Sequence, residues 1–304
     1  MNSHLQSGVI VIDKPANISS AKAVASVKRI LRAEKAGHAG TLDPLATGVL
    51  ICCLNSATKL AQFFLNGRKK YSAVLHLGVQ TDTQDSSGTI TDRCEYTALS
   101  EPMIRSAIKQ FQGTIEQLPP VYSALKYNGV PLYRHARKGN PVQKPPRQVH
   151  ISSINILKIN LPMVTFEVLC SAGTYIRTLC SDIGKSLGCG GHLKELRRIE
   201  SSEFTINEAL TLVGLEKLAF RGNVSKRIIS MVDALRGMTA VKVDDKLAQK
   251  IKYGNLIRKN DLNPVGIKGS EGFIKVIDSA NQLIAVMRQI PTDDRLNYCC
   301  VFPN

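Results

Sequence analysis

The sequence predicts an α+β fold, in which a mixed, mainly antiparallel sheet is followed by a small β-rich C-terminal module. Segments with strand and helix patterns interleave without the regular strand–helix–strand repetition that builds a parallel sheet. Several strand-like segments, such as 149–159 and 163–170, also follow one another directly, and such neighbours pair as antiparallel strands. The 304 residues are 43% hydrophobic, which is enough to bury the core of one or two domains.

The first third of the chain alternates strand and helix patterns. Apolar runs and apolar stripes at helical spacing predict, in chain order, a strand at 8–13, a helix from Ser19 or Ser20 to about Arg32, a strand at 49–54, a helix at 57–65 and a strand at 71–79. Ser19 or Ser20 can cap the first helix, and Val24, Val27 and Leu31 share its apolar face.

The middle of the chain is interrupted by a proline-rich excursion at 119–147, which is basic and irregular. A long irregular segment in a compact domain is usually functional or disordered. Around it the sequence predicts a polar turn at 81–88, a helix at 101–111, strands at 149–159 and 163–170, a helix at 174–187, strands at 192–200 and 202–206, and short helices within 207–220.

A change of pattern near residues 235–238 predicts a domain boundary. We assign residues 1–236 to a first, larger domain and residues 237–304 to a second, smaller one. The smaller domain is rich in strand patterns and has one helical segment. Its predicted elements include strands at 272–277 and 283–287 and a helix at 244–252.

The net charge of +16 indicates an anionic partner. The N-terminus has no secretory signal and no apolar run is long enough to span a membrane, so we expect nucleic acid as the partner. The eight cysteines include no Cys-x-x-Cys pair, which argues against a disulfide framework and a zinc ribbon. We therefore expect a cytoplasmic protein with no membrane contact and no metal.

The positive charge is unevenly distributed along the chain. No Asp or Glu occurs between Glu116 and Glu167, although a solvated surface normally mixes both signs. The basic residues of this interval are Lys126, Arg134, Arg137, Lys138, Lys144, Arg147 and Lys158. We expect this segment to contact phosphates. The alternative is a flexible surface loop that happens to be basic.

One carboxylate, Asp43, lies in a loop shaped by glycine and proline. Gly40 and Gly48 allow close backbone approach or a positive φ on either side, and Pro44 favours an extended conformation at Asp43. A carboxylate presented in this way before an apolar strand can be catalytic. The local chemistry alone nevertheless favours an ordinary turn aspartate that bonds backbone N–H groups.

Five motifs decide between these two interpretations of Asp43. In chain order they are Ile12-Asp13-Lys14-Pro15, Gly37-His38-Ala39-Gly40-Thr41-Leu42-Asp43-Pro44, Arg68-Lys69-Lys70-Tyr71, Pro119-Pro120-Val121-Tyr122-Ser123-Ala124-Leu125-Lys126 and Ala172-Gly173-Thr174-Tyr175-Ile176-Arg177-Thr178-Leu179. In this order and spacing, residues 8–235 resemble the bacterial tRNA pseudouridine synthases that modify uridine 55 of the T loop. The tail is similar to the PUA-like RNA-binding module of that family.

The resemblance implies a catalytic centre built on Asp43, Arg177 and Tyr71. Asp43 would be the nucleophile, attacking either the uracil or the ribose, and Arg177 would keep it ionised through a bidentate pair. Tyr71 would stack on the flipped uracil, with its hydroxyl near C5 as a general base. Taken alone, Arg177 could instead form an ordinary ion pair at a helix start, and Tyr71 could be a core residue.

The resemblance also implies which residues bind the substrate. His38 would fill the space that the flipped base leaves, and Tyr175, Leu196 and Lys14 would line the pocket. Taken alone, these are a loop histidine, two core side chains and a turn lysine. The 119–147 excursion corresponds to the RNA-gripping insertion of the family, whose RNA-binding residues here would be Lys126, Arg134, Arg137, Lys138 and Arg147.

The sequence therefore predicts a stand-alone, monomeric isomerase that needs no cofactor and acts on the T stem-loop of tRNA. A guide-RNA-dependent pseudouridine synthase shares the same core but largely lacks the long insertion at 119–147. A non-catalytic protein that binds or folds tRNA would explain the charge. It would not explain why Asp43, Tyr71 and Arg177 occur together.

Overall fold

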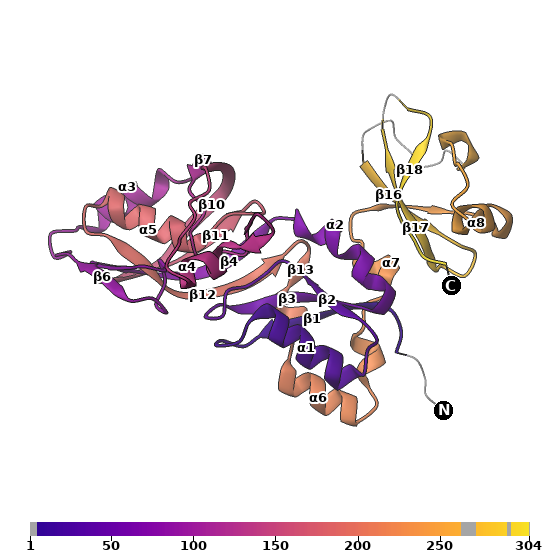
Figure 1. Ribbon diagram of the computed structural model, residues 1–304, viewed down its shortest axis with the longest axis horizontal. Helices are drawn as coiled ribbons and strands as arrows, with labels where there is room; N and C mark the ends of the chain where they lie inside the picture. Colours follow the sequence, from indigo (N-terminus) through magenta and orange to yellow (C-terminus); the bar gives the residue numbers. More distant parts are fainter. Residues whose placement is uncertain (1–4, 263–271, 291–292, 304) are drawn as a thin grey trace.

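The computed structural model describes residues 5–262, 272–290 and 293–303, which form a large sheet and a small sheet (Figure 1). The strands of the large sheet are β1 (Gly8–Lys14), β2 (Ala36–Ala39), β3 (Thr47–Leu54), β4 (Lys69–Leu77), β7 (Gly113–Gln117), β10 (Arg147–Asn160), β11 (Met163–Cys170), β12 (Gly191–Ser201), β13 (Phe204–Thr205) and β14 (Leu210–Thr211). Their order is β14-β1-β3-β12-β4-β11-β10-β7, with β2 beside β3 and β13 beside β12.

The large sheet is mixed and mainly antiparallel, as predicted. Among the strand pairs that the structure describes in it, β1 with β14 and β3 with β12 are parallel and the others are antiparallel. In the β3–β12 pair, Thr47 and Gly48 lie beside Arg197 and Arg198. Gly48 has a φ of +101°, and a Cβ there would come within 2.2 Å of the Arg198 carbonyl oxygen. Only glycine therefore allows β3 to start directly after the Asp43 loop.

Helices cover the large sheet at both of its ends (Figure 1). They are α1 (Ser20–Leu31), α2 (Ala61–Leu65), α3 (Glu101–Lys109), α5 (Ile176–Ser186), α6 (Leu212–Phe220) and α7 (Met231–Ala234), with 3₁₀-helices η1 (Asn55–Leu60), η2 (Ile206–Glu208) and η3 (Val224–Arg227). Helix α1 begins as predicted, because the Ser19 side chain accepts from the Lys22 N–H at 3.1 Å. It buries Val24, Val27 and Leu31 against the sheet.

The 119–147 insertion contains short regular elements. These are a two-stranded hairpin of β8 (Lys126–Tyr127) and β9 (Val130–Pro131), followed by α4 (Leu132–Arg137). The predicted polar turn at 81–88 lies in a second hairpin, which consists of β5 (Val79–Thr81) and β6 (Ile90–Arg93). Both hairpins therefore project from the sheet as connections between its strands.

The small sheet has the order β15-β16-β17-β18 and packs against the large sheet. Its elements are β15 (Thr239–Lys242), α8 (Asp245–Lys252), η4 (Lys259–Asp261), β16 (Gly272–Ile277), β17 (Leu283–Gln289) and β18 (Leu296–Val301). Leu283 and Phe302 share an apolar cluster with Phe64 and Phe204 of the larger part. The Lys59 ammonium group also donates to the Val301 carbonyl at 2.8 Å. The division of the chain at residue 236 stays a prediction.

Several short strands differ from what the sequence predicts. Residues 36–39, expected as loop, form β2, in which His38 lies opposite Cys52 of β3. Residues 210–211, expected in a helical stretch, form β14 beside β1. Strands β7, β15 and β18 were not predicted either. Strands β7, β14 and β15 pair with strands that are distant in sequence, so the local pattern carries no signal for them. Strands β2 and β18 pair with a strand nearby in the chain, β3 and β17 respectively.

Candidate active site

Asp43 and Arg177 form an ion pair where the Asp43 loop meets the start of α5. The distance from Arg177 Nε to Asp43 Oδ2 is 2.9 Å, and the side chains are 4% and 33% exposed respectively. The two terminal nitrogens of Arg177 donate to the carbonyls of Thr83 and Tyr122, each at 2.8 Å. The contact is therefore made through Nε and not through the bidentate pair that the resemblance implies. The guanidinium is held by the backbone whether or not Asp43 is present.

Asp85 is a second carboxylate beside Arg177, and sequence reasoning missed it. Its Oδ2 lies 3.6 Å from Arg177 Nε, and the residue is buried. Its Oδ1 accepts from the Thr83 hydroxyl at 2.7 Å and from the N–H and hydroxyl of Ser87 at 2.9 and 2.5 Å. The Asp-Ser-Ser-Gly turn that contains Asp85 looked like an ordinary polar turn. Its carboxylate instead balances the buried charge of Arg177.

The Asp43 loop is fastened to the strand and helix before it. The Ser20 hydroxyl donates to the Leu42 carbonyl at 3.0 Å and accepts from the Leu42 N–H at 2.8 Å. The Asn17 N–H donates to the Pro44 carbonyl at 2.8 Å. The first residue of α1 and the turn before that helix thus hold the residues on both sides of Asp43.

Lys14 also fastens this loop. It is fully buried, and its ammonium group donates to the carbonyls of Pro15, Ile18 and Pro44 at 2.8, 2.8 and 3.3 Å. Burial lowers the pKa of Lys14 to about 8, against the opposing effect of the Asp43 charge. An ammonium group has three donors. Because backbone carbonyls take all three, Lys14 differs from the substrate contact that the resemblance implies.

Arg198, which the sequence analysis did not single out, is among the largest fully buried side chains. Its Nε donates to the Val49 carbonyl at 2.7 Å and its Nη2 to the Gly40 carbonyl at 3.0 Å. These bonds join β12 to the residues before and after the Asp43 loop. A charged residue inside a strand pattern gives no local indication of such a role, because its partners come from β2 and β3.

Tyr71 lies on β4 with its ring in the apolar cluster that also contains Leu42 and Leu196. Burial raises the pKa of the Tyr71 phenol, while the neighbouring Arg198 guanidinium opposes this shift and the Asp43 charge adds to it. Tyr71 is therefore both a core residue and a neighbour of Asp43. Leu196, on β12, is buried in the same cluster.

His38 lies on β2, five residues before Asp43, and Tyr175 is the residue directly before α5, two residues before Arg177. Burial, together with Arg198, lowers the pKa of His38 below its usual 6.5, so its ring is neutral at pH 7. Its Nδ1 is buried and has no hydrogen-bond partner. The Tyr175 backbone is held by the Gln117 side chain, at 2.7 Å from its N–H and 3.0 Å from its carbonyl.

Comparisons with known proteins bear on the family of the chain. Residues 28–176 match the N-terminal domain of the TruB family pseudouridylate synthases, and residues 177–238 match the tRNA pseudouridylate synthase B C-terminal domain. The tRNA pseudouridine synthase B of Syntrophus aciditrophicus is 44% identical over 95% of this chain and 93% of its own. The chain belongs to the TruB family of pseudouridylate synthases. It is therefore an isomerase.

Two further relatives show how much of the chain the likeness covers. The tRNA pseudouridine synthase B of Geobacter sulfurreducens is 43% identical over 81% of each chain. A chain in the structure of an H/ACA RNP bound to a substrate RNA containing 2′-deoxyuridine superposes with a TM-score of 0.76 at 28% identity. That superposition covers 99% of this chain and 86% of the other. The small C-terminal sheet is therefore included in the likeness.

Most basic residues of the insertion of this TruB protein are exposed. Lys126, Arg134, Arg137 and Lys138 point into solvent, and the Arg137 guanidinium lies 5.6 Å from the centre of the Tyr133 ring. Arg147 differs from them. It is half-buried, donates to the Gly173 carbonyl and lies over the Tyr175 ring at 4.8 Å. Arg147 thus belongs to the wall of the site as well as to the insertion.

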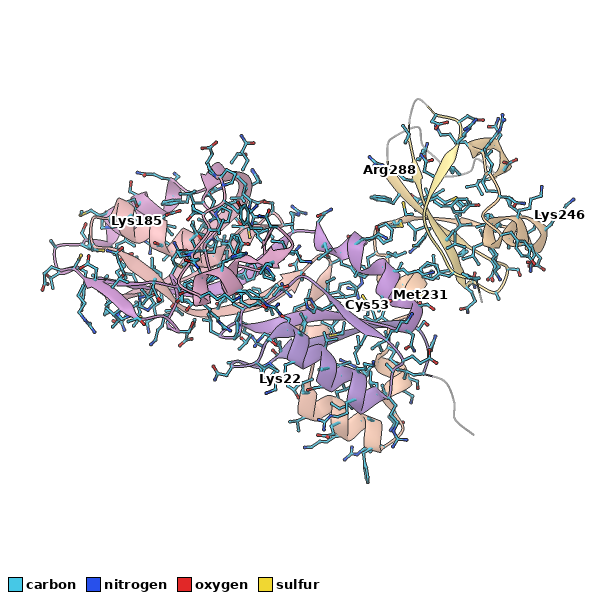
Figure 2. The ribbon with its side chains drawn as sticks, in the orientation of Figure 1. Lys22, Cys53, Lys185, Met231, Lys246 and Arg288 are labelled. Carbon is cyan, nitrogen blue, oxygen red and sulfur yellow. The ribbon has the colours of Figure 1, made fainter. Side chains whose placement is uncertain are left out.

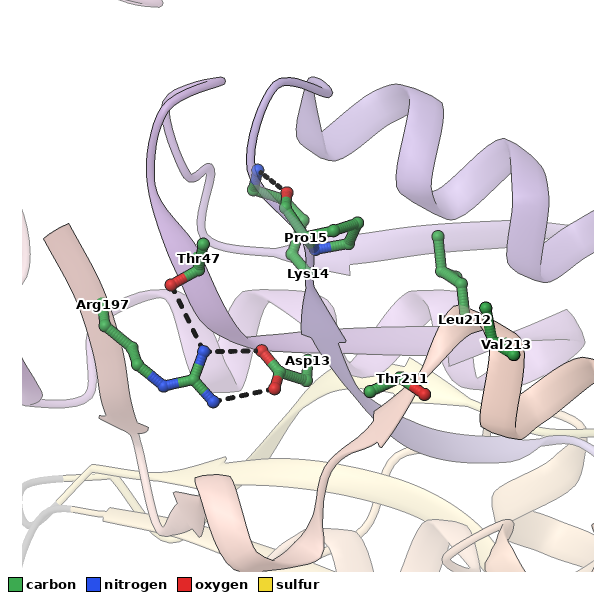
Figure 3. A pocket seen from close by; sticks show the side chains of 8 residues that line it. All are labelled: Asp13, Lys14, Pro15, Thr47, Arg197, Thr211, Leu212 and Val213. Carbon is green, nitrogen blue, oxygen red and sulfur yellow. Dashed lines mark hydrogen bonds and ion pairs between the residues drawn. The ribbon is translucent and has the colours of Figure 1, made fainter. Parts of the chain in front are cut away.

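A pocket of about 230 Å³ is lined by residues 13–15, by Thr47 and Arg197 and by residues 211–213 (Figure 3). Arg197 makes a bidentate pair with Asp13, at 3.0 and 2.7 Å, and its Nη1 lies 3.3 Å from the Thr47 hydroxyl. This group of side chains ties β1, β3 and β12 together beside the loop. Asp13 belongs to one of the sequence motifs, but neither it nor Arg197 was assigned a role there.

Within residues 5–262, 272–290 and 293–303, no three His, Cys, Asp or Glu side chains are grouped so that they could hold a metal ion. In the same part of the chain, no helix has both the length and the apolar character needed to cross a membrane.

Proposed function

We propose that this enzyme converts uridine 55 in the T loop of tRNA to pseudouridine, with Asp43 as the nucleophile. The observation that carries the proposal is the Asp43–Arg177 ion pair, in which the guanidinium is buried and the carboxylate remains partly accessible. Identity of 40–44% to several proteins named tRNA pseudouridine synthase B supports tRNA as the substrate. A tRNA substrate in turn supports a cytoplasmic location.

The reaction is an exchange of one glycosidic bond for another. The bond from C1′ to N1 breaks, the uracil turns, and a bond forms from C1′ to C5. The proton on C5 is then lost and N1 is protonated, so that the product is an isomer of the substrate. A carboxylate that attacks and later leaves divides this exchange into easier steps. The partly exposed Asp43 suits attack at uracil C6 as well as at the ribose.

Arg177 holds the Asp43 carboxylate in place through their 2.9 Å ion pair before substrate binds. Its terminal nitrogens are bound to the carbonyls of Thr83 and Tyr122, so it cannot follow the carboxylate if that moves. A charge fixed in this way needs no reorganisation during the reaction. This fixed cation is what distinguishes Asp43 from a turn aspartate.

Tyr71 supplies the face on which the uracil stacks. Burial keeps its phenol protonated near neutral pH, because it raises the pKa of the hydroxyl above 10. The Arg198 guanidinium opposes that shift. To act as the general base that we assign to it, Tyr71 first gives up its own phenolic proton, and the phenolate oxygen then takes the proton from C5. The neighbouring Arg198 guanidinium stabilises that phenolate.

His38, Tyr175 and Leu196 accommodate the flipped nucleotide. Removing a base from a folded loop costs a few kcal/mol, about 2 to 4, and contacts in the pocket must offset this cost. The neutral His38 ring has an unpartnered Nδ1 that the RNA can pair with once the base has left. The exposed Lys126, Arg134, Arg137 and Lys138 would hold the phosphates of the T arm, as the insertion of the family implies.

Mapping of pseudouridine tests this function directly. The purified protein is incubated with an unmodified tRNA transcript, and the product is digested and examined by mass spectrometry after labelling of pseudouridine. We expect one new pseudouridine, at position 55. The same transcript with a deletion of its T arm is the control. A pseudouridine at another position, or one that forms without the T arm, would contradict the proposal.

A further inference from the structure

A second basic surface lies at the end of the molecule formed by α1 and α6, away from the insertion. It contains a groove of about 1500 Å³, which we call the α1–α6 groove. The wall from α1 includes Arg29 and Arg32, and the opposite wall includes Ala219 and Phe220. Helices α1 and α6 pack on the same end of the sheet, in one apolar cluster with β1 and β3 (Figure 1).

The lining of the groove carries Arg29 and Arg32 together with Glu34 and Glu216, and the excess of positive charge lies in the segments around it. Residues 20–35 and 212–228 together contain nine Lys and Arg but only two Glu. Lys28 and Arg29, in the last turn of α1, complement the helix dipole. Arg221 is the C-cap residue of α6 and is placed to do the same for that helix, whereas Lys226 and Arg227, which are also exposed, lie on the short η3 beyond it. Such an excess of one sign on a protein surface is typical of contact with a polyanion.

A solvent-exposed aromatic ring lies beside these charged residues. Phe220 is 93% exposed, the highest exposure among the large hydrophobic residues that the structure describes. Exposed aromatic rings next to basic side chains are the usual platform for unpaired bases, because every base can stack on them. An acidic protein would use the charges but would have no particular use for an isolated ring.

Helix α1 connects this groove to the catalytic loop. Its first residue, Ser20, binds Leu42 of the Asp43 loop, and Arg29 and Arg32 stand at its other end. Its 12 residues span about 18 Å. An RNA whose T loop reaches Asp43 therefore lies within a few nucleotides of the groove.

We propose that the α1–α6 groove binds a part of the same tRNA outside its T arm, through phosphates and one unpaired base that stacks on Phe220. The inference rests on the proposed function, since it takes tRNA as the substrate. The groove would add affinity for the whole tRNA without taking part in the isomerisation.

The test compares whole tRNA with an isolated T-arm stem-loop. The variants are Phe220→Ala and the triple Arg29→Gln, Arg32→Gln, Arg221→Gln, which keeps long polar side chains. The matched control removes three exposed charges near α3, α5 and β6, in the triple Arg93→Gln, Lys109→Gln, Lys185→Gln. Figure 2 places Lys185 at the opposite end of the large sheet from Lys22 of α1. Dissociation constants are measured at several salt concentrations.

We expect the groove triple to bind whole tRNA roughly tenfold more weakly and to lower the salt slope by about 2 to 3, one for each lost phosphate contact. Phe220→Ala should weaken binding without changing the slope. Neither variant should alter binding or turnover of the stem-loop. Unchanged binding of whole tRNA would overturn the inference and favour an acidic protein as the occupant. An equal loss with the stem-loop would overturn it too.

A failure of the groove inference can be distinguished from a failure of the proposed function. If the isomerisation site were misassigned, an Asp43 variant would retain activity. The groove variants would still discriminate between whole tRNA and its stem-loop in a binding measurement.

Discussion

Arg177 Nε lies 2.9 Å from Asp43 Oδ2, while the other end of the same guanidinium is bound to two backbone carbonyls. Three separate segments, around Asp43, Thr83 and Tyr122, therefore meet on one buried cation. The carboxylate of Asp85 lies on the same side, at 3.6 Å from Nε. The orientation of Asp43 is thus set by contacts that exist before any RNA binds.

Replacement of Arg177 by lysine tests this orientation. An ammonium group cannot reach both carbonyls and the Asp43 carboxylate from a fixed position, so the charge remains but its geometry is lost. We expect the single-turnover rate of pseudouridine formation to fall roughly 100-fold or more, while the Kd for tRNA changes little. A rate close to that of the unchanged enzyme would show that the fixed geometry is unimportant.

The Asp13–Arg197 pair predicts a measurable coupling in stability. Asp13→Ala, Arg197→Ala and the double variant form a double-mutant cycle, followed by urea unfolding. Because the pair is bidentate but partly exposed, we expect a coupling energy of about 1 kcal/mol. Simple additivity of the two single effects would mean that the pair does not brace the strands beside the Asp43 loop.

The buried Lys14 predicts a specific pH dependence of stability. Its pKa is about 8 in the folded protein and 10.5 in the unfolded chain, so between these values the unfolded chain binds more protons. Stability from this group therefore rises as the pH increases from about 8 to 10.5. Relative to Lys14→Met, the free energy of unfolding should rise by up to about 3 kcal/mol over that window.

This comparison cancels the titration of all other groups, including the buried cysteines, because both proteins share them. Urea unfolding at pH 7.5, 9 and 10.5, values chosen to bracket the shift, is the measurement. A difference between the two proteins that stays constant, or that falls as the pH increases, would contradict the buried position of the ammonium group.

Variants of the 119–147 insertion should lose tRNA binding in a different way from variants of the α1–α6 groove. Replacing Arg134, Arg137 and Lys138 by alanine removes three exposed cations from the insertion. If they hold the T arm, whole tRNA and the isolated stem-loop should both bind more weakly, and the salt slope should fall by about 2 to 3 in both cases. An unchanged slope with the stem-loop would show that the insertion does not contact its phosphates.

The sequence predicts those helices and strands that depend on local features. The α1 start at Ser19, the apolar run of β3 and the α5 stripe follow from caps and periodicity, and the fold class follows from their order. The family motifs named Asp43, Arg177 and Tyr71, which the structure brings into one site. Strands β2 and β14 could not be predicted, since each is stabilised only by its pairing partner.

The roles of the side chains that hold the Asp43 loop and Arg177 could not be predicted for a related reason. Arg198 is a fully buried cation that binds the distant carbonyls of Gly40 and Val49. Lys14 is fully buried too, and one of its three carbonyl partners, Pro44, is distant in sequence. Asp85 looks like a turn residue until Arg177 is placed beside it. Each of these residues owes its role to a tertiary contact, and the pattern of residues along the sequence does not indicate that contact.

The most direct measurement is the release of tritium from tRNA labelled at C5 of its uridines, made with the unchanged enzyme and with Asp43→Asn. Asparagine keeps the shape of the loop residue but cannot act as a nucleophile. The account predicts that tritium release is abolished while the Kd for tRNA stays within about threefold of its original value. Tritium release by Asp43→Asn at a rate near that of the unchanged enzyme would contradict it.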